Sequence, residues 1–203
     1  LQTVFGLDAA RIAAAFLVAP ATMAQRLVRA KAKIRDAAIR YEEPAAEELP
    51  ERLHAVLESI YAAYGTGWEA AFALPADLRP APPATADGDF TGEALYLATL
   101  VAELLPAAAE AQGLRALLMF CESRRAAHLD ADGRFVPLTA QDTRRWDVAR
   151  IRAADDLLWR AARLGEPGPF QLEAAIQSAH CQRAFRKSTP WSAIASLYAA
   201  LGD

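Results

Sequence analysis

The sequence predicts an all-α protein. Several long stretches repeat leucine, isoleucine, valine or alanine every three or four residues, a spacing that places them on one side of a helix. Segments rich in glycine and proline separate these stretches. With 203 residues, of which 54% are hydrophobic, the chain can bury a core and can hold two parts. We expect no β-sheet.

Residues 1–40 predict two helices joined by a short turn. Asp8 is placed to cap the first helix, and Ile12 and Phe16 lie on its apolar stripe. Residues 17–19 form the turn that leads into a second helix. This pattern indicates a helix-turn-helix.

The second helix runs from Pro20, which suits a first helical turn, past Ile34. At about 100° per residue, one of its sides is apolar, and this side consists of Met23, Leu27, Ala30 and Ile34. We expect it to face the first helix, with Ile12 and Phe16 packed on Met23 and Leu27.

The exposed side of the second helix predicts a DNA-contacting surface. Polar residues come first and cations follow, in the order Thr22, Gln25, Arg26, Arg29 and Lys33, with Lys31 and Arg35 on the opposite flank. A major groove admits an α-helix, whose early side chains reach base edges while later Lys and Arg residues contact phosphates. A solvated basic face on an ordinary surface helix has the same composition. The preceding helix and the tight turn favour the DNA interpretation.

Residues 7–34, LDAARIAAAFLVAPATMAQRLVRAKAKI, resemble region 4 of RNA polymerase sigma factors of the extracytoplasmic-function group. The match to that region's recognition helix rests on Thr22, Arg26, Leu27, Arg29 and Ala30. Residues 49–68 and 168–180 resemble the subgroup with a long, tetratricopeptide-like helical C-terminal extension, although no clean 34-residue repeat is visible. By this resemblance the chain begins inside region 4.

The resemblance implies a function in transcription initiation. Region 4 of these factors binds the promoter −35 element and the RNA polymerase core, and region 2, which contacts the −10 element, would lie upstream of Leu1. The C-terminal extension would regulate activity through contacts with a regulatory protein. An alternative of another class is a helical scaffold that binds a protein or senses a small ligand, in which the helix-turn-helix is only a packing surface.

The charge of the chain is divided unevenly. Residues 1–40 hold 7 basic and 2 acidic residues, whereas the remainder holds 15 basic and 23 acidic residues, so the net charges are +5 and −8. This asymmetry favours nucleic-acid contact at the amino end and protein contacts elsewhere. No run of about eighteen apolar residues predicts a membrane span, and we expect a cytoplasmic protein.

Glutamates and prolines predict a linker at residues 41–48, before a helical domain at residues 49–203. A helix from Pro50, with an apolar face through Leu57, Ile60 and Tyr64, should end at the glycines at positions 65 and 67. Residues 75–92 predict an extended loop. A stretch around residues 95–105 is apolar nearly all round, so we expect it at the centre of the core.

Four further features follow along the chain. A helix over residues 108–128 should turn Leu114, Leu117, Leu118 and Cys121 inward. Asp130 to Gly133 predict a plain turn rather than a calcium loop. A capping box at Thr139 and Asp142 predicts a long helix that carries Trp146 and ends at Gly165. Helices opening at Pro169 and at Pro190 complete the chain.

Nothing in the sequence predicts an enzyme or a cofactor. Phosphate-binding, dinucleotide-binding, nucleophile-elbow and zinc-protease motifs are absent. Cys121 and Cys181 form no CxxC pair and should be buried as small hydrophobes, so no metal is expected. The remaining aromatic residues of interest could line a groove, but we expect core or inter-helix contacts for Trp146, Trp159, Trp191 and Tyr198.

Overall fold

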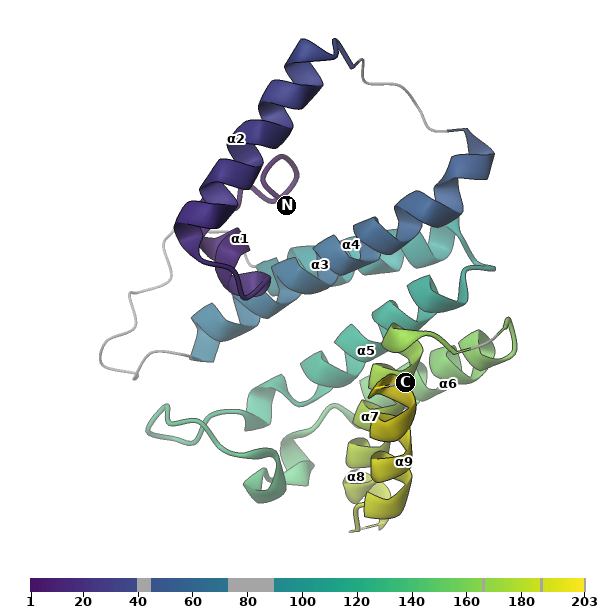
Figure 1. Cartoon of the computed structure of the whole chain (residues 1–203). Helices are drawn as coiled ribbons and strands as arrows, with labels where there is room; N and C mark the ends of the chain where they lie inside the picture. Colours follow the sequence, from purple (N-terminus) through teal and green to yellow (C-terminus); the bar gives the residue numbers. More distant parts are fainter. Residues whose placement is uncertain (40–44, 73–89, 166, 187, 203) are drawn as a thin grey trace. The chain divides into compact units, whose positions relative to one another are not determined.

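The computed structural model describes residues 1–39, 45–72, 90–165, 167–186 and 188–202 (Figure 1). The predicted all-α fold is confirmed, because these residues form helices and no strand, with one isolated antiparallel bridge between Leu129 and Phe135. No helix in these ranges is both long enough and apolar enough to cross a bilayer.

The chain divides into two compact units. Unit 1 comprises Leu1–Ala71 and Asp87–Ala94, and unit 2 comprises Phe72–Ala86 and Leu95–Asp203. Residues 41–44 of the predicted linker and most of the predicted loop at residues 75–92 lie outside the described residues. The division into residues 1–40, 41–48 and 49–203 therefore stays a prediction.

Unit 1 opens with the two expected helices, α1 (Ala9–Ala15) and α2 (Pro20–Asp36). Asp8 caps α1 as predicted, because its Oδ1 accepts a hydrogen bond from the backbone N–H of Arg11 at 2.8 Å. The turn between the helices places Leu17 at φ 51°, a conformation unusual for leucine, and leaves its side chain in solvent.

The predicted packing of α1 on α2 is correct only in part. Ile12 and Met23 are buried, but Phe16 is 44% exposed and Ile34 is 53% exposed, so neither of these two side chains is buried between the helices as predicted. The reason is length: α1 has 7 residues and α2 has 17, about 10 Å against about 25 Å at the helical rise. The two helices pack along the amino-terminal half of α2, and Ala30, like Ile34, is exposed beyond it.

Helix α3 (Leu49–Phe72) follows a 3-10 turn, η1 (Ala46–Glu48). Leu57, Ile60 and Tyr64 are buried as expected, but the predicted end at the two glycines is wrong, because α3 continues for five residues beyond the second. A Cβ at Gly67 would lie 2.9 Å from Cβ of Phe90, in the first turn of α4 (Phe90–Leu104). Gly67 therefore allows a close helix approach rather than ending the helix.

Unit 2 is organised around α5 (Ala109–Ser123), which packs against both α6 (Val148–Ala162) and α7 (Pro169–Cys181) (Figure 1). The predicted inward leucines of α5 are confirmed: Leu114, Leu117 and Leu118 are at most 1% exposed. The core was predicted instead at residues 95–105, and this is wrong. Helix α4 buries mainly alanines there, and Leu104 is 69% exposed.

The contact between α5 and α7 is unusually close. A Cβ at Gly113 of α5 would lie 2.7 Å from Cγ and 2.9 Å from the backbone nitrogen of Gln171. One turn earlier, the Glu110 carboxylate accepts hydrogen bonds from the backbone N–H groups of Phe170 at 2.9 Å and Gln171 at 3.0 Å. A side chain of α5 thus caps the amino end of α7.

An irregular segment joins α5 to α6. The predicted turn is confirmed, since Asp130 Oδ1 accepts from the backbone N–H groups of Asp132 and Arg134. The long helix predicted from Thr139 is wrong: three short 3-10 turns, η3 (Arg125–Ala127), η4 (Leu138–Ala140) and η5 (Thr143–Arg145), precede α6. Asp142 caps η5 instead, and Asp147 caps α6 by accepting from the backbone N–H of Arg150.

The chain ends with α8 (Arg183–Arg186) and α9 (Trp191–Gly202), and Ile194 of α9 packs on Ile176 and Ala179 of α7. Among the aromatic residues predicted to lie in the core, Trp146 is buried. Trp159 and Tyr198 are 74% and 57% exposed, so neither lies in the core as predicted. Trp191 is 58% exposed, but it makes an inter-helix contact of the predicted kind, because its ring meets that of His180 on α7 edge-on with the ring centroids 5.7 Å apart. Both cysteines are free thiols, Cys181 fully buried and Cys121 half-buried.

Candidate nucleic-acid interface

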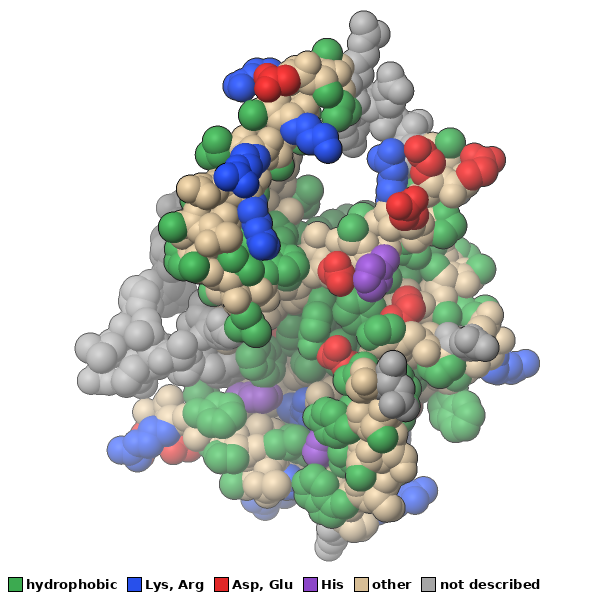
Figure 2. Space-filling view, in the orientation of Figure 1, with side chains coloured by type: hydrophobic (Ala, Val, Ile, Leu, Met, Phe, Trp, Pro, Cys, Tyr) green, Lys and Arg blue, Asp and Glu red, His purple; other side chains and the backbone are tan. Residues whose placement is uncertain are grey.

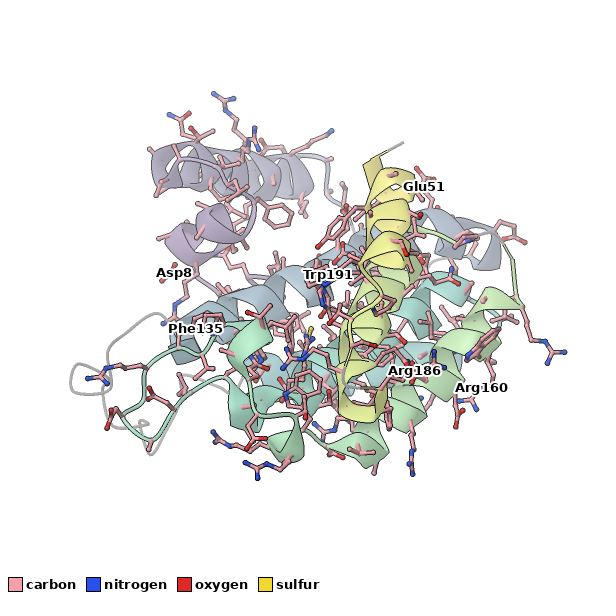
Figure 3. The ribbon with its side chains drawn as sticks, turned by 90° about the horizontal axis from the view of Figure 1, so that it is seen from below. Asp8, Glu51, Phe135, Arg160, Arg186 and Trp191 are labelled. Atoms are coloured by element: carbon pink, nitrogen blue, oxygen red, sulfur yellow. The ribbon has the colours of Figure 1, made fainter. Side chains whose placement is uncertain are left out.

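The surface predicted to contact DNA lies on α2. All seven predicted residues are exposed: Thr22, Gln25, Arg26, Arg29, Lys31, Lys33 and Arg35. Figure 2 shows Lys and Arg side chains spread along this helix, and in Figure 3 nitrogen-tipped side chains extend from α2 on the side away from α1. The structure therefore brings the predicted residues together on one accessible helix.

Local chain geometry explains why this helix is displayed. Asp8, labelled in Figure 3, starts α1 by its side-chain cap, and Pro20 occupies the first turn of α2 after the extended residue Ala19. Residues 28–36 of α2 are exposed apart from half-buried Ala32, so the cations of its later turns lie in solvent.

Most of the positive charge on α2 is not neutralised by the described residues. Arg35 pairs with Asp36 at 3.3 Å, and both side chains are largely exposed, so this pair contributes little to stability. No carboxylate of the described residues lies within ion-pair distance of Arg26, Arg29 or Lys31. Favourable interaction with the carboxyl end of the helix dipole accounts for cations in the last turn, such as Arg35, but not for Arg26 and Arg29.

The spacing of the cations fits an extended anionic surface. Arg26, Arg29 and Lys33 follow an i, i+3, i+7 pattern on one side, which spans about 10 Å of helix. Thr22 and Gln25 stand on the same side, nearer the amino end. Guanidinium groups can bond guanine edges or phosphates, and a glutamine amide can bond adenine.

The sequence interpretation missed two residues that support this unit. Phe5 and Leu7 are 8% and 1% exposed, and both precede the cap of α1. Leu7 stands immediately before the capping Asp8, and Ile12 is the fourth helical residue, which is the hydrophobic-staple pattern. That pattern was the signal that could have placed Leu7 in the core.

Within the described ranges, no group of three or more His, Cys, Asp or Glu side chains could hold a metal ion. Asp155 accepts a hydrogen bond from Ser178 Oγ, and burial raises the pKa of its carboxyl group.

Comparison with known proteins gives relatives but no activity. Residues 52–162 match the family of unknown function DUF6596, a range that begins in α3 and ends with α6. Over 201 residues, 99% of this chain, the sequence is 39% identical to an uncharacterized protein of Rhizobium meliloti (strain 1021). The chain spans 45% of the length of that relative. No solved structure matches the chain.

Proposed function

This chain belongs to the DUF6596 family of unknown function, and we propose that it binds DNA through α2 as part of a sigma factor of the extracytoplasmic-function group. In this proposal α2 contacts the promoter −35 element in the cytoplasm, and the protein recruits the RNA polymerase core. The resemblance of residues 7–34 to region 4 supplies the promoter element and the polymerase.

One observation carries the proposal. The seven residues predicted from the sequence are all exposed on α2, and the helix has no acidic residue before Asp36. A merely solvated face does not require this segregation, because exposed helices ordinarily intersperse both signs of charge. DNA binding favours this segregation, because Lys and Arg side chains without a carboxylate partner can neutralise phosphates and release their counterions.

The polar residues and the cations should have different roles in this interface. Arg26 and Arg29 lie on the side that also carries Thr22 and Gln25, so they would read base edges. Lys31 and Lys33 lie further along the helix, where they would contact phosphates. Base contacts decide which sequence is bound, whereas phosphate contacts strengthen binding to every sequence.

Unit 2 would act through protein contacts. Trp159 of α6 and Trp191 and Tyr198 of α9 are more than half exposed, and aromatic side chains of this kind are enriched in protein interfaces. A regulatory protein or the polymerase itself would be the partner of these exposed side chains.

The proposal is tested by measuring binding to a −35 duplex selected from a random library and to a scrambled duplex across a salt series. Arg26→Ala with Arg29→Ala should reduce binding to the selected duplex and remove the preference between the two, because each lost base contact costs about 1–3 kcal/mol. Lys31→Ala with Lys33→Ala should weaken binding to both duplexes equally and reduce the slope of log K against log salt by about 2.

Arg160→Ala, which removes an exposed arginine of unit 2, is the matched control and should change neither property. Equal losses from the two α2 double variants on both duplexes would mean that α2 is only an electrostatic surface. Full binding by both would show that α2 does not contact DNA.

A further inference from the structure

A buried guanidinium lies at the carboxyl end of α5. Arg124 is the residue that ends this helix, and it is only 5% exposed. Its Nη2 donates a hydrogen bond to Oε1 of Gln177 on α7. Among the described residues, its Nε and Nη1 have no hydrogen-bond acceptor and no carboxylate lies within ion-pair distance, and the group beside the guanidinium is the weakly accepting sulfur of Cys121.

A second guanidinium lies against the same aromatic ring. Cζ of Arg124 is 6.0 Å and Cζ of Arg183 is 5.5 Å from the ring centroid of Trp146. Arg183 is satisfied differently, because it donates to the backbone carbonyl groups of Leu138 and Gln141. The cluster formed by Arg124, Trp146 and Arg183 thus joins the end of α5, the segment before α6 and helix α8.

The open hydrogen-bonding groups of this cluster are mostly donors. Nε and Nη1 of Arg124 and Nε1 of Trp146 are buried N–H groups without an acceptor, and Oε1 of Gln141 is a buried acceptor without a donor. A water molecule could connect Trp146 to Gln141, but water carries no charge and cannot neutralise Arg124.

No acidic side chain of the described residues forms an ion pair with Arg124, although Glu122 and Glu173 act electrostatically on the neighbouring Cys121 thiol. Burial raises the pKa of the Cys121 thiol, and burial raises that of Cys181 to about 11, so both stay protonated at neutral pH. Burial, and then the charge of Arg124, lower the pKa of His180 and lower that of His128 to about 4, so both stay neutral. The nearest acidic side chain in sequence, Glu122, pairs with Arg125 at 3.1 Å.

A buried cation without a counter-ion is among the costliest features a fold can contain, and the carbonyl groups at the end of α5 offset it only in part. From these contacts we propose that unit 2 binds a small carboxylate against Arg124 and Trp146. A carboxylate is planar and presents two oxygens, which matches the flat guanidinium, and it has a further lone pair for the indole N–H. The inference is independent of DNA binding by α2.

An anion would reach the cluster by way of the segment between α5 and α6, which supplies Trp146. Residues 125–147 contain three single 3-10 turns and one isolated bridge, so their backbone hydrogen bonds are those of separate turns rather than of a continuous helix. Segments of this kind open locally at a lower free energy than packed helices do. Exchange of the carboxylate should follow this opening and not require unfolding of α5, α6 or α7.

The proposal is tested with the full chain and defined anions. The melting temperature is measured in sodium acetate, sodium formate, sodium phosphate and sodium chloride at equal ionic strength. Acetate and formate should raise it saturably, by roughly 5–10 °C at one hundred times the dissociation constant. Arg124→Gln should abolish the rise, Trp146→Phe should increase the dissociation constant several-fold, and Arg125→Gln, at the half-exposed neighbour that pairs with Glu122, should keep the full response.

A second measurement does not depend on folding of the variants. The ¹⁹F resonance of trifluoroacetate should broaden with the unaltered protein and sharpen again on addition of acetate, but not of chloride. A saturable response to phosphate alone would overturn the assignment to carboxylates. Equal responses to all four salts, or an unchanged ¹⁹F line, would show that only water accompanies Arg124.

Discussion

Two glycines in α3 provide a direct test of the packing in unit 1. Gly65 and Gly67 lie two residues apart within the same helix. Alanine at either position should gain about 1 kcal/mol from helix propensity. A Cβ at Gly65 would meet nothing within 4 Å, whereas a Cβ at Gly67 would lie 2.9 Å from Cβ of Phe90 and 3.0 Å from the backbone nitrogen of Thr91.

The overlap of a Cβ at Gly67 with its neighbours cannot be relieved by rotating a side chain, because the nitrogen of Thr91 belongs to the backbone. Relief requires a shift of about 0.5 Å between α3 and the start of α4, and overpacking of this kind costs about 1–3 kcal/mol. Gly65→Ala should therefore stabilise unit 1 by about 1 kcal/mol, and Gly67→Ala should be about 1–3 kcal/mol less stable than Gly65→Ala.

Urea unfolding followed by circular dichroism at several wavelengths measures both variants against the unaltered protein. The comparison between the two variants cancels their shared gain in helix propensity. If Gly67→Ala proved as stable as Gly65→Ala, the close approach of α3 to Phe90 and Thr91 would be refuted.

Two further predictions concern burial and pH. Ile12→Ala should destabilise unit 1 by about 2–5 kcal/mol and expose residues before 45 to protease. Phe16→Ala should cost much less, because its side chain is half-exposed. Similar losses of stability in the two variants would contradict the burial described for α1. Burial, and then the charge of Arg124, lower the folded-state pKa of His128 to about 4 from an ordinary 6.5. Between these two pH values the unfolded chain binds more protons than the folded chain does. The free energy of unfolding must therefore fall as the pH decreases from 6.5 to 4. The loss should reach up to about 3 kcal/mol in urea titrations and should be smaller in His128→Gln; an equal loss in that variant would assign it to other groups.

Much of the fold could be predicted because it depends on local signals. The cap at Asp8, the proline that opens α2 and the prolines that open α7 and α9 act within a few residues, and each helix begins where they indicate. The exposure of the basic face of α2 was predicted for the same reason, since helical spacing alone separates it from Met23 and Leu27.

The errors arise where the partner of a residue lies far away in the sequence. Gly67 has the same local signal as a helix-ending glycine, and only the approach of Phe90 distinguishes the two. Arg124 has the composition of an ordinary cation at a helix end, but α7 and the segment before α6 bury it. The DNA-binding role of the α2 residues stays a prediction.

The uneven distribution of charge is described more accurately when the chain is divided after residue 94 as well as after residue 40. Residues 41–94 hold 2 basic and 11 acidic residues, whereas residues 95–203 hold 13 basic and 12 acidic residues. The acidic excess therefore belongs to the region of α3 and the residues that follow it, and the chain of unit 2 from residue 95 onward is nearly neutral. The charge of residues 95–203 therefore gives no reason to exclude this part of the chain from contact with DNA.

The cap of α7 determines how unit 2 can be assembled. Its first N–H groups bond to Glu110, which lies 60 residues earlier, and the residue before the helix, Gly168, has no side chain to take that place. A Cβ at Gly168 would lie 2.5 Å from Cδ of Glu110, so a local cap would collide with the distant one. Because α5 leaves the ribosome before α7, Glu110 is already present when the first turn of α7 forms, and a fragment that separates the two helices should lose helical structure at the amino end of α7. The cap of α7 is therefore present only in a chain that also contains Glu110.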